Sequence, residues 1–191
     1  MDTSKLGLQN YLPNGQPTET IYNNYVLQNS GLFKTINVKD KCVLDVGCGN
    51  GRLNILMTDA KQIIGLDLID RLDARFITKN FRFILDNIFY FDYRYCKFDY
   101  ILFIGTFYLH NEFGYGNVMC QTKSLLYPDG KIIILDDVKR FHNKESREGF
   151  HDIYHLIEVA KLKITDILTP NSKYNIYILG ADSETINNIQ K

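Results

Sequence analysis

The sequence lacks an excess of charge of either sign. Its 22 Lys and Arg residues balance 22 Asp and Glu residues, so the formal net charge at pH 7 is zero. Proteins that hold nucleic acid or an anionic membrane through a global field carry a basic surplus. The composition therefore argues against those partners, although a local basic patch remains compatible with this balance.

Paired cysteines, a signal peptide and long apolar runs are also lacking. The four cysteines form no CxxC pair and show no disulfide-framework spacing, which is typical of free thiols in a reducing compartment. The first 20 residues have neither the basic start nor the apolar core of a signal peptide. No apolar run approaches the length of a membrane span. We therefore expect a cytoplasmic protein.

The length and the hydrophobic content fit one domain. A chain of 191 residues with 45% hydrophobic residues can bury a sizeable core but is too short to suggest two cores. Residues 1–39 are expected to form a polar lead-in and a capping helix over about 21–33. Residues 40–191 are expected to form an α/β core.

Within that core, short apolar runs alternate with amphipathic segments, a rhythm that predicts βαβ units with helices on both faces of a sheet. The last two runs follow each other across the turn sequence TPNSK, which favours an antiparallel hairpin. We predict a doubly wound, mostly parallel seven-stranded sheet with a C-terminal antiparallel hairpin. Strands are expected at 42–47, 62–67, 82–85, 98–105, 130–136, 163–168 and 174–179, helices at 50–60, 115–126 and 147–160, and a turn at 126–130.

Three glycines follow the first strand at alternate positions, Gly47, Gly49 and Gly51. Glycine permits positive φ and lets a ligand approach the main chain closely. Asp67 ends the next strand, 20 positions after Gly47, where its carboxylate can accept hydrogen bonds from both hydroxyls of a ribose. The glycine loop and this acid together predict a nucleoside-containing ligand.

Two features argue against a dinucleotide as that ligand. The dinucleotide pattern GxGxxG has its third glycine where this chain has Arg52. In addition, a plain dinucleotide-binding sheet has no reason to end in an inserted antiparallel strand. An NAD-dependent oxidoreductase is therefore disfavoured.

The run DVGCGNG resembles the first motif of class I S-adenosylmethionine-dependent methyltransferases. Asp67 resembles the family's ribose-binding acid, Asp86-Asn87 the pair that contacts the adenine amino group, and 126–130 its LxPGG turn, with Asp129 replacing one glycine. The resemblance extends over residues 40–180 and implies a Rossmann-like methyltransferase fold with S-adenosylmethionine as the methyl donor. The donor-binding residues that it implies are Tyr25, Asp45, Gly47, Cys48, Gly49, Gly51, Asp67, Leu68, Asp86, Asn87, Ile88 and Ile104.

Asp45 and Tyr25 each keep two interpretations. Asp45, just before the glycine loop, either orients the loop and the donor's amino group or only braces the loop with a hydrogen bond. Tyr25, in the expected capping helix, either meets the donor's sulfonium or carboxylate or is a packing residue. The loop itself is expected to offer backbone N–H groups to the donor's carboxylate near a helix N-terminus.

Candidates for catalysis follow the fourth and fifth strands. His110 could act as a general base because the ordinary pKa of histidine lies near neutrality, and Asp137 and His142 lie on the same expected rim. Each is equally compatible with a structural or surface role. HDIYH at 151–155 has two histidines one helical turn apart but no third ligand, so we expect no metal.

The acceptor is less defined than the donor. Zero net charge and a short chain favour a small molecule such as a sugar, metabolite or natural product, methylated at oxygen or nitrogen. A protein or RNA methyltransferase is an alternative, but residues 104–107 read IGTF instead of an NPPY-type tetrapeptide. A protein that binds the donor without turnover is a third possibility.

Overall fold

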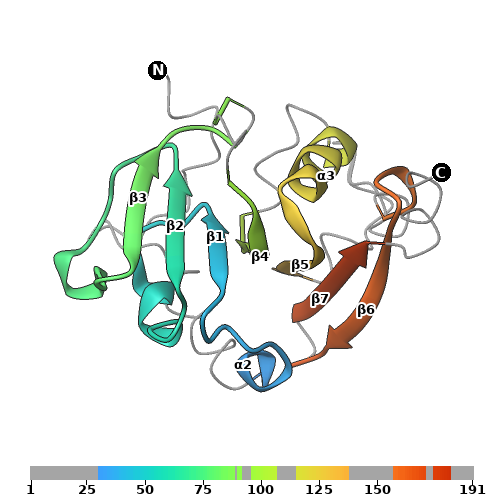
Figure 1. The fold of residues 1–191 in the computed structure, drawn as a ribbon, viewed down its shortest axis with the longest axis horizontal. Helices are drawn as coiled ribbons and strands as arrows, with labels where there is room; N and C mark the ends of the chain where they lie inside the picture. The colour runs from blue at the N-terminus through green and yellow to red at the C-terminus, as the bar shows by residue number, and fades with distance from the viewer. Residues whose placement is uncertain are drawn as a thin grey trace.

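The computed structural model describes residues 30–88, 90–91, 96–106, 115–137, 157–170 and 174–181. These residues form one seven-stranded sheet with the strand order β3-β2-β1-β4-β5-β7-β6 (Figure 1). Its strands are β1 (Cys42–Val46), β2 (Gln62–Asp67), β3 (Phe81–Leu85), β4 (Phe98–Ile104), β5 (Leu126–Asp137), β6 (Leu162–Leu168) and β7 (Tyr174–Ala181).

The pairing directions confirm the predicted sheet. Strands β1 to β5 pair in parallel, whereas β7 inserts antiparallel between β5 and β6. Parallel pairing needs crossovers, and the apolar strands are consequently buried on both faces. The sheet is therefore mostly parallel, and the predicted hairpin forms its end.

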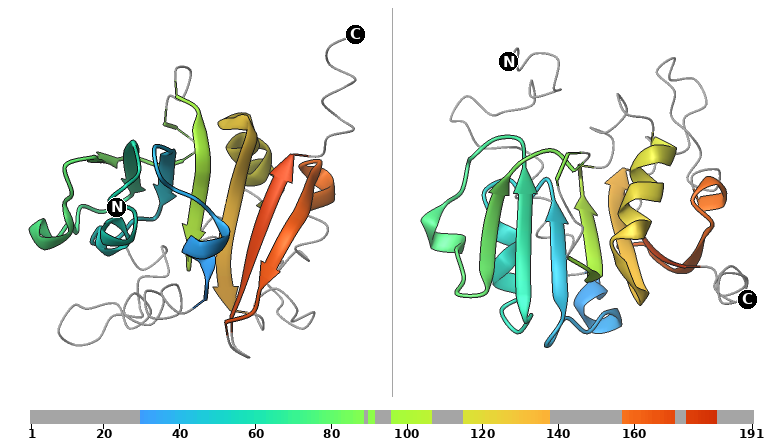
Figure 2. Two further views of the ribbon diagram at one scale, coloured as in Figure 1. Left: turned by 60° about the horizontal axis from the view of Figure 1, so that its bottom comes forward. Right: turned by 45° about the horizontal axis from the view of Figure 1, so that its top comes forward.

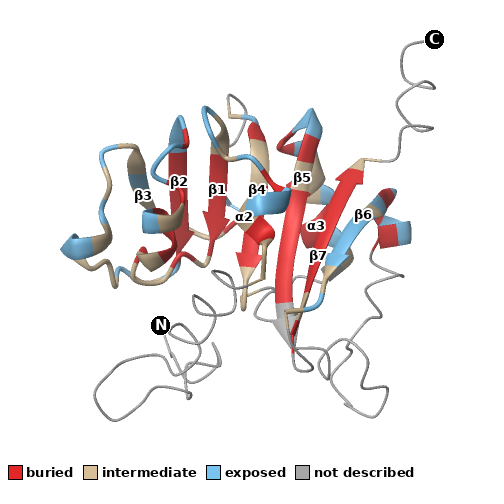
Figure 3. Cartoon of the chain, turned by 90° about the horizontal axis from the view of Figure 1, so that it is seen from below, coloured by how far each residue is buried: buried red, intermediate tan, exposed pale blue. Residues whose placement is uncertain are grey.

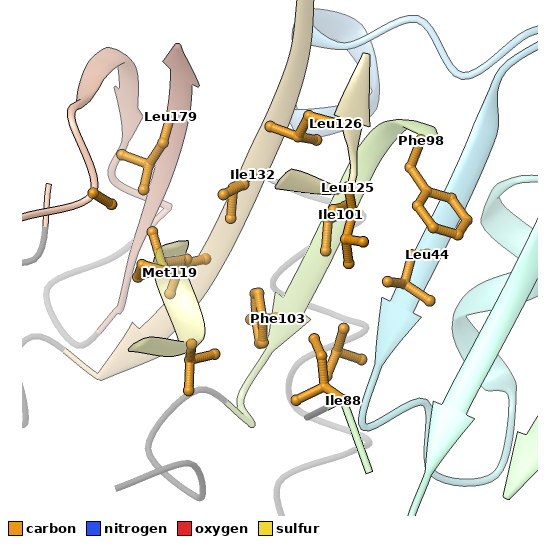
Figure 4. Close-up of a cluster of buried hydrophobic side chains, with 14 of the residues drawn as sticks. Leu44, Ile88, Phe98, Ile101, Phe103, Met119, Leu125, Leu126, Ile132 and Leu179 are labelled. Atoms are coloured by element: carbon orange, nitrogen blue, oxygen red, sulfur yellow. The ribbon is translucent and has the colours of Figure 1, made fainter. Parts of the chain in front are cut away.

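Alternate residues of the central strands supply two hydrophobic layers. Along β1, Leu44 and Val46 face one layer, which receives Val118 of α3 (Tyr115–Ser124) and appears in Figure 4. Val43 faces the other layer, which receives Leu32 of α2 (Leu32–Thr35). Figure 3 shows the resulting burial concentrated in the central strands, with exposed segments along β6 and β3. In the described part of the chain, no helix is long and apolar enough to cross a membrane.

The helix expected at 50–60 is much shorter in the structure. It is the 3-10 helix η2 (Arg52–Leu56), which ends with the Met57 N–H donating to the Asn54 carbonyl. The buried Asn54 side chain also donates to the carbonyl of Phe76, 3.3 Å away. Asn, Thr and Asp offer such alternatives to helical bonding, and the tight i to i+3 bonds suit a short connection.

The turn expected at 126–130 is instead an irregular start to β5. The strand register jumps from Phe98 opposite Leu126 to Tyr100 opposite Lys131, which is a bulge. Gly130 is needed there because a Cβ atom would lie 2.9 Å from the carbonyl oxygen of Phe98. The sequence signal was therefore correct for a break in regularity, but wrong for a turn between elements.

The other expected helices are described in part. Helix α3 ends two residues earlier than predicted, and of the helix expected at 147–160 the described residues 157–159 are helical. Residues 1–29 lie outside the described part of the chain. Between β2 and β3 the structure has only the short 3-10 helix η3 (Ala74–Phe76), so this crossover is largely irregular.

Candidate functional site

The predicted site residues gather at the carboxyl ends of the parallel strands, the upper edge in the right-hand view of Figure 2. The strand order reverses between β1 and β4, because β2 and β3 continue on one side and β5 on the other. Open α/β sheets bind ligands at such a switch point. The glycine loop follows β1 and lies at this position.

All three loop glycines have left-handed backbone conformations, with φ of 73° at Gly47, 58° at Gly49 and 80° at Gly51. The N–H groups of Gly47 and Cys48 donate to the Leu66 carbonyl, at 2.7 and 3.2 Å, and that of Gly51 donates to the Cys48 carbonyl. The first two bonds hold the loop against β2, and the third closes a turn within the loop. The loop leads into the five-residue 3-10 helix η2, so the helix that follows it is shorter than the one expected at 50–60. That the loop offers N–H groups to the donor's carboxylate stays a prediction.

Gly47 and Gly49 differ in what surrounds them. A Cβ at Gly47 would lie 2.5 Å from Cγ2 of Thr106, whose hydroxyl donates to the Val46 carbonyl at 2.8 Å. A Cβ at Gly49 would meet nothing within 4 Å. The loop is therefore packed against the end of β4 at its start and open at its middle.

Asp67, at the end of β2, lies beside the open part of the loop. Its carboxylate accepts hydrogen bonds from the N–H groups of Gly49 at 2.8 Å and Ile69 at 3.1 Å, and its side chain is 7% exposed. Burial raises the pKa of this carboxyl, and the backbone N–H groups oppose that rise. The Arg71 guanidinium lies 3.4 Å from the same carboxylate.

Asp45 is a buried acid below the loop. It is 2% exposed, and its Oδ2 has no hydrogen-bond partner in the described structure. Burial, and secondarily the charge of Asp67, raises its pKa to about 7. A buried carboxylate oxygen without a partner is costly. Both interpretations of Asp45, orienting the donor and bracing the loop, stay predictions.

The remaining donor residues differ in exposure. Leu68 is 46% exposed directly after Asp67, whereas Ile88 is 2% exposed and belongs to the core layer labelled in Figure 4. The Asp86 N–H donates to the Asp67 carbonyl at 3.1 Å, and the Asn87 N–H donates to the Asp86 carboxylate.

Two further predicted residues contribute to the packing around the loop. Cys48 is 7% exposed, and burial raises the pKa of its thiol; its donor-binding role stays a prediction. Ile104, at the end of β4, packs partly buried against the second core layer.

Several predicted residues cannot be compared with the structure. Tyr25, His110, His142 and the HDIYH segment lie outside the described residues, and Asp137 is described only as the last residue of β5, opposite Tyr174. The described residues contain no group of His, Cys, Asp and Glu side chains that could hold a metal ion.

The structure adds two residues that the sequence did not single out, Thr106 and Arg71. Thr106 follows the end of β4 and contacts the loop through Val46, which lies 60 positions away in the sequence, so only the strand order brings them together. Arg71 reaches Asp67 from four positions on. That spacing would have been a signal on a helix, but the chain is irregular there.

Comparison with known proteins identifies the family. A family model described as a methyltransferase domain matches residues 37–175. No curated protein sequence matches the chain.

Solved structures share the fold at low sequence identity. The N-methyltransferase NodS of Bradyrhizobium japonicum, in complex with S-adenosyl-l-homocysteine, is 15% identical with a TM-score of 0.69, over 93% of this chain and 98% of that one. The 1,6-didemethyltoxoflavin-N1-methyltransferase of Burkholderia thailandensis, with its namesake compound and S-adenosylhomocysteine bound, is 17% identical with a TM-score of 0.66, over 86% and 82%. The magnesium protoporphyrin IX methyltransferase ChlM of Synechocystis, with S-adenosylmethionine bound, is 15% identical with a TM-score of 0.66, over 95% and 92%.

The family match spans most of the chain, including the glycine loop, both buried acids and β4. The observed strand order and its antiparallel end agree with the predicted Rossmann-like methyltransferase fold. The chain belongs to the methyltransferase-domain family and is a class I S-adenosylmethionine-dependent methyltransferase.

Proposed function

We propose that this methyltransferase transfers the methyl group of S-adenosylmethionine to a small-molecule acceptor, at an oxygen or a nitrogen atom. Zero net charge supports a small acceptor. So do the compounds named for two proteins of similar fold, 1,6-didemethyltoxoflavin and magnesium protoporphyrin IX. The four unpaired cysteines support the cytoplasm as the location.

The observation that carries the donor assignment is the Asp45 carboxylate. Its buried, unpartnered Oδ2 is a ready acceptor for a cation, and the amino group of the donor's methionine part is one. Burial of an ionised carboxylate below the glycine loop costs solvation free energy. Attraction to a cationic partner would offset that cost. We therefore assign Asp45 to the amino-acid end of the donor.

The other end of the donor site is proposed at β2 and β3. Asp67 would accept the ribose hydroxyls, since its carboxylate lies beside the open middle of the loop at Gly49. The exposed side chain of Leu68 offers an apolar surface for adenine. Asp86 and Asn87 follow β3 at the same edge and supply polar groups for the adenine amino group.

Catalysis in this assignment is chiefly a matter of position. When bound, S-adenosylmethionine supplies a methyl group on a sulfonium that an acceptor lone pair can attack. Holding two reactants in near-attack geometry is worth about 7–11 kcal/mol in well-oriented systems. Strands β4 and β5 end at the same edge of the sheet as β1, so we propose that the residues after them hold the acceptor.

Three residues of that rim are proposed to act on the acceptor. His110 would take its proton, a role that suits the ordinary pKa of histidine. Asp137, which ends β5, and His142 would bind or deprotonate it. Tyr25 is proposed to approach the donor from the N-terminal segment.

The test of the donor site is a calorimetric titration with S-adenosylmethionine and S-adenosylhomocysteine. We expect both to bind the wild type, and binding to collapse in Asp67→Ala. Asp73→Ala is the matched control, because Asp73 pairs with Arg75 on the surface and does not touch Asp67. Equal affinity of Asp67→Ala and wild type would overturn the ribose assignment.

The acceptor class needs a separate measurement. With methyl-labelled donor, we expect label to enter the small-molecule fraction of an extract and to be reduced in His110→Ala. Label found only in protein or RNA would favour the alternative acceptors. Donor binding without any labelled product would favour a donor-binding protein.

A further inference from the structure

The Asp67 carboxylate is already saturated with hydrogen bonds in this structure. Its Oδ2 accepts from the Gly49 N–H at 2.8 Å and from Arg71 at 3.4 Å, and its Oδ1 accepts from the Ile69 N–H at 3.1 Å and from Arg71 at 3.5 Å. An ionised carboxylate has about four lone-pair sites. A ribose diol that donates to Asp67 therefore has to displace one of these partners.

The weakest partner is Arg71. The N–H bonds of Gly49 and Ile69 have ordinary lengths and belong to the loop and strand end, so losing them would disturb the backbone. The Arg71 contacts are longer than the roughly 2.7–2.9 Å of a good charge-assisted bond. Its side chain is 31% exposed, so, unlike the two backbone N–H groups, the guanidinium can leave Asp67 without a shift of the main chain.

We propose that Arg71 competes with the ribose diol for Asp67 and so sets the affinity of the site for nucleoside ligands. This inference rests on the proposed role of Asp67 as the ribose acid. The guanidinium occupies the acceptor positions that the two hydroxyls need, and each binding event must break the Arg71–Asp67 pair. A ligand without a ribose diol does not have to break it.

The experiment compares S-adenosylhomocysteine affinity in wild type, Arg71→Met and Arg71→Lys by calorimetry. Because the Arg71 contacts are long and its side chain is partly exposed, the competition is expected to be modest, and Arg71→Met should bind about two- to five-fold more tightly than wild type. Arg71→Lys, which keeps the charge, should stay near wild type. The difference between wild type and Arg71→Met should shrink as salt is added, because salt screens the pair.

Two controls separate competition from a structural effect. Arg75→Met removes an arginine from the same segment that pairs with Asp73 instead, and should leave the affinity unchanged. Adenine, which has no diol, should bind Arg71→Met and wild type equally, whereas adenosine should follow S-adenosylhomocysteine. Arg71→Gln repeats the test if Arg71→Met does not fold.

Equal or weaker S-adenosylhomocysteine binding by folded Arg71→Met and Arg71→Gln would overturn the proposal while leaving the donor site intact. An equal gain for adenine would overturn it too, since the effect would then not involve the diol. Absence of binding in every variant and in wild type would overturn the donor site itself, and this inference with it.

Discussion

Burial of the Asp45 carboxyl makes the donor-free protein less stable as pH rises. Its pKa is raised from 3.8 to about 7, so between these values the folded protein holds a proton that the unfolded chain has released, and stability is lost as pH increases through the window. The shift corresponds to roughly 4 kcal/mol. Urea unfolding should show the stability advantage of Asp45→Asn over wild type larger at pH 8 than at pH 5, because only part of the loss has occurred by pH 5. The exposed Asp59→Asn is the control, and a wild type equally stable at both pH values would contradict the argument.

The same carboxylate predicts how donor affinity depends on pH. Below about pH 7 Asp45 must release a proton before it can accept the donor's ammonium group. Affinity for S-adenosylhomocysteine should therefore fall about tenfold per pH unit below 7, and should be weak and insensitive to pH in Asp45→Asn. Calorimetry from pH 5.5 to 8 measures this. A flat wild-type profile would remove Asp45 from the amino-acid end of the donor site.

The sequence predicted the positions of Asp45 and Asp67, but not which groups surround their carboxylates. A strand-end Asp and the acid before a glycine loop are visible as pattern. That Asp45 has an unpartnered oxygen, and that Arg71 fills the lone pairs of Asp67, depends on side-chain placement in three dimensions. The sequence therefore predicts which residues form the proposed donor site, whereas their burial and their hydrogen-bond partners come from the structure.

Within the glycine loop, Gly47 and Gly49 form a natural pair for comparison. Both have positive φ, so alanine at either site costs about 1–2 kcal/mol in backbone strain. Only at Gly47 would the new methyl group also clash with Thr106, which adds roughly 1–3 kcal/mol. Denaturant unfolding should show Gly47→Ala clearly less stable than Gly49→Ala.

Gly49→Ala should instead affect the ligand. Its methyl group enters space that is empty in this structure and that we assign to the donor, so affinity for S-adenosylhomocysteine should fall about tenfold. Similar stability of the two alanine variants, or unchanged affinity of Gly49→Ala, would contradict this division of the loop into a packed and an open part.

The opposite edge of the sheet is tied by Asp99. Its carboxylate accepts from Lys41 Nζ and from the Cys42 N–H, each at 2.9 Å, and so joins the starts of β4 and β1. Asp99→Ala should lower stability by about 1–2 kcal/mol, mainly because the Cys42 N–H loses its partner. Donor affinity should not change, since the strands run away from this edge to the site. A loss of affinity with unchanged stability would contradict a purely structural role.

The ends of the strands were predictable to within four residues, and the connections were less so. Short apolar runs that end in Gly or Asp mark buried parallel strands whatever their neighbours are. The segment after Gly51 has a helical pattern of apolar residues, but it forms only a short 3-10 helix, in which the Asn54 side chain bonds to the Phe76 carbonyl. Likewise Gly130 was read as a turn residue, while the strand pairing with β4 makes it a bulge.

In the whole molecule, the residues that stabilise the fold and the residues proposed to bind ligands lie in different parts of the sheet. The two hydrophobic layers hold the central strands, and the switch point brings β1, β2 and β4 together at one edge. This part follows from alternating strands and helices and could be predicted from the sequence. The proposed acceptor side could not, because the conformation of a connecting segment depends on that segment's own contacts.

Ligand-induced stabilisation tests the whole assignment at once. A ligand that binds only the folded protein stabilises it by about 2.7 kcal/mol at 100 times its Kd, which for a chain of this size raises the melting temperature by roughly 5–10 °C. We expect that shift with S-adenosylhomocysteine in wild type, a much smaller one in Asp67→Ala, and none with NAD, because Arg52 stands where the dinucleotide pattern has its third glycine. A shift with NAD as large as that with S-adenosylhomocysteine would mean that the loop and Asp67 recognise the adenosine alone, and that donor specificity lies in the residues around Asp45.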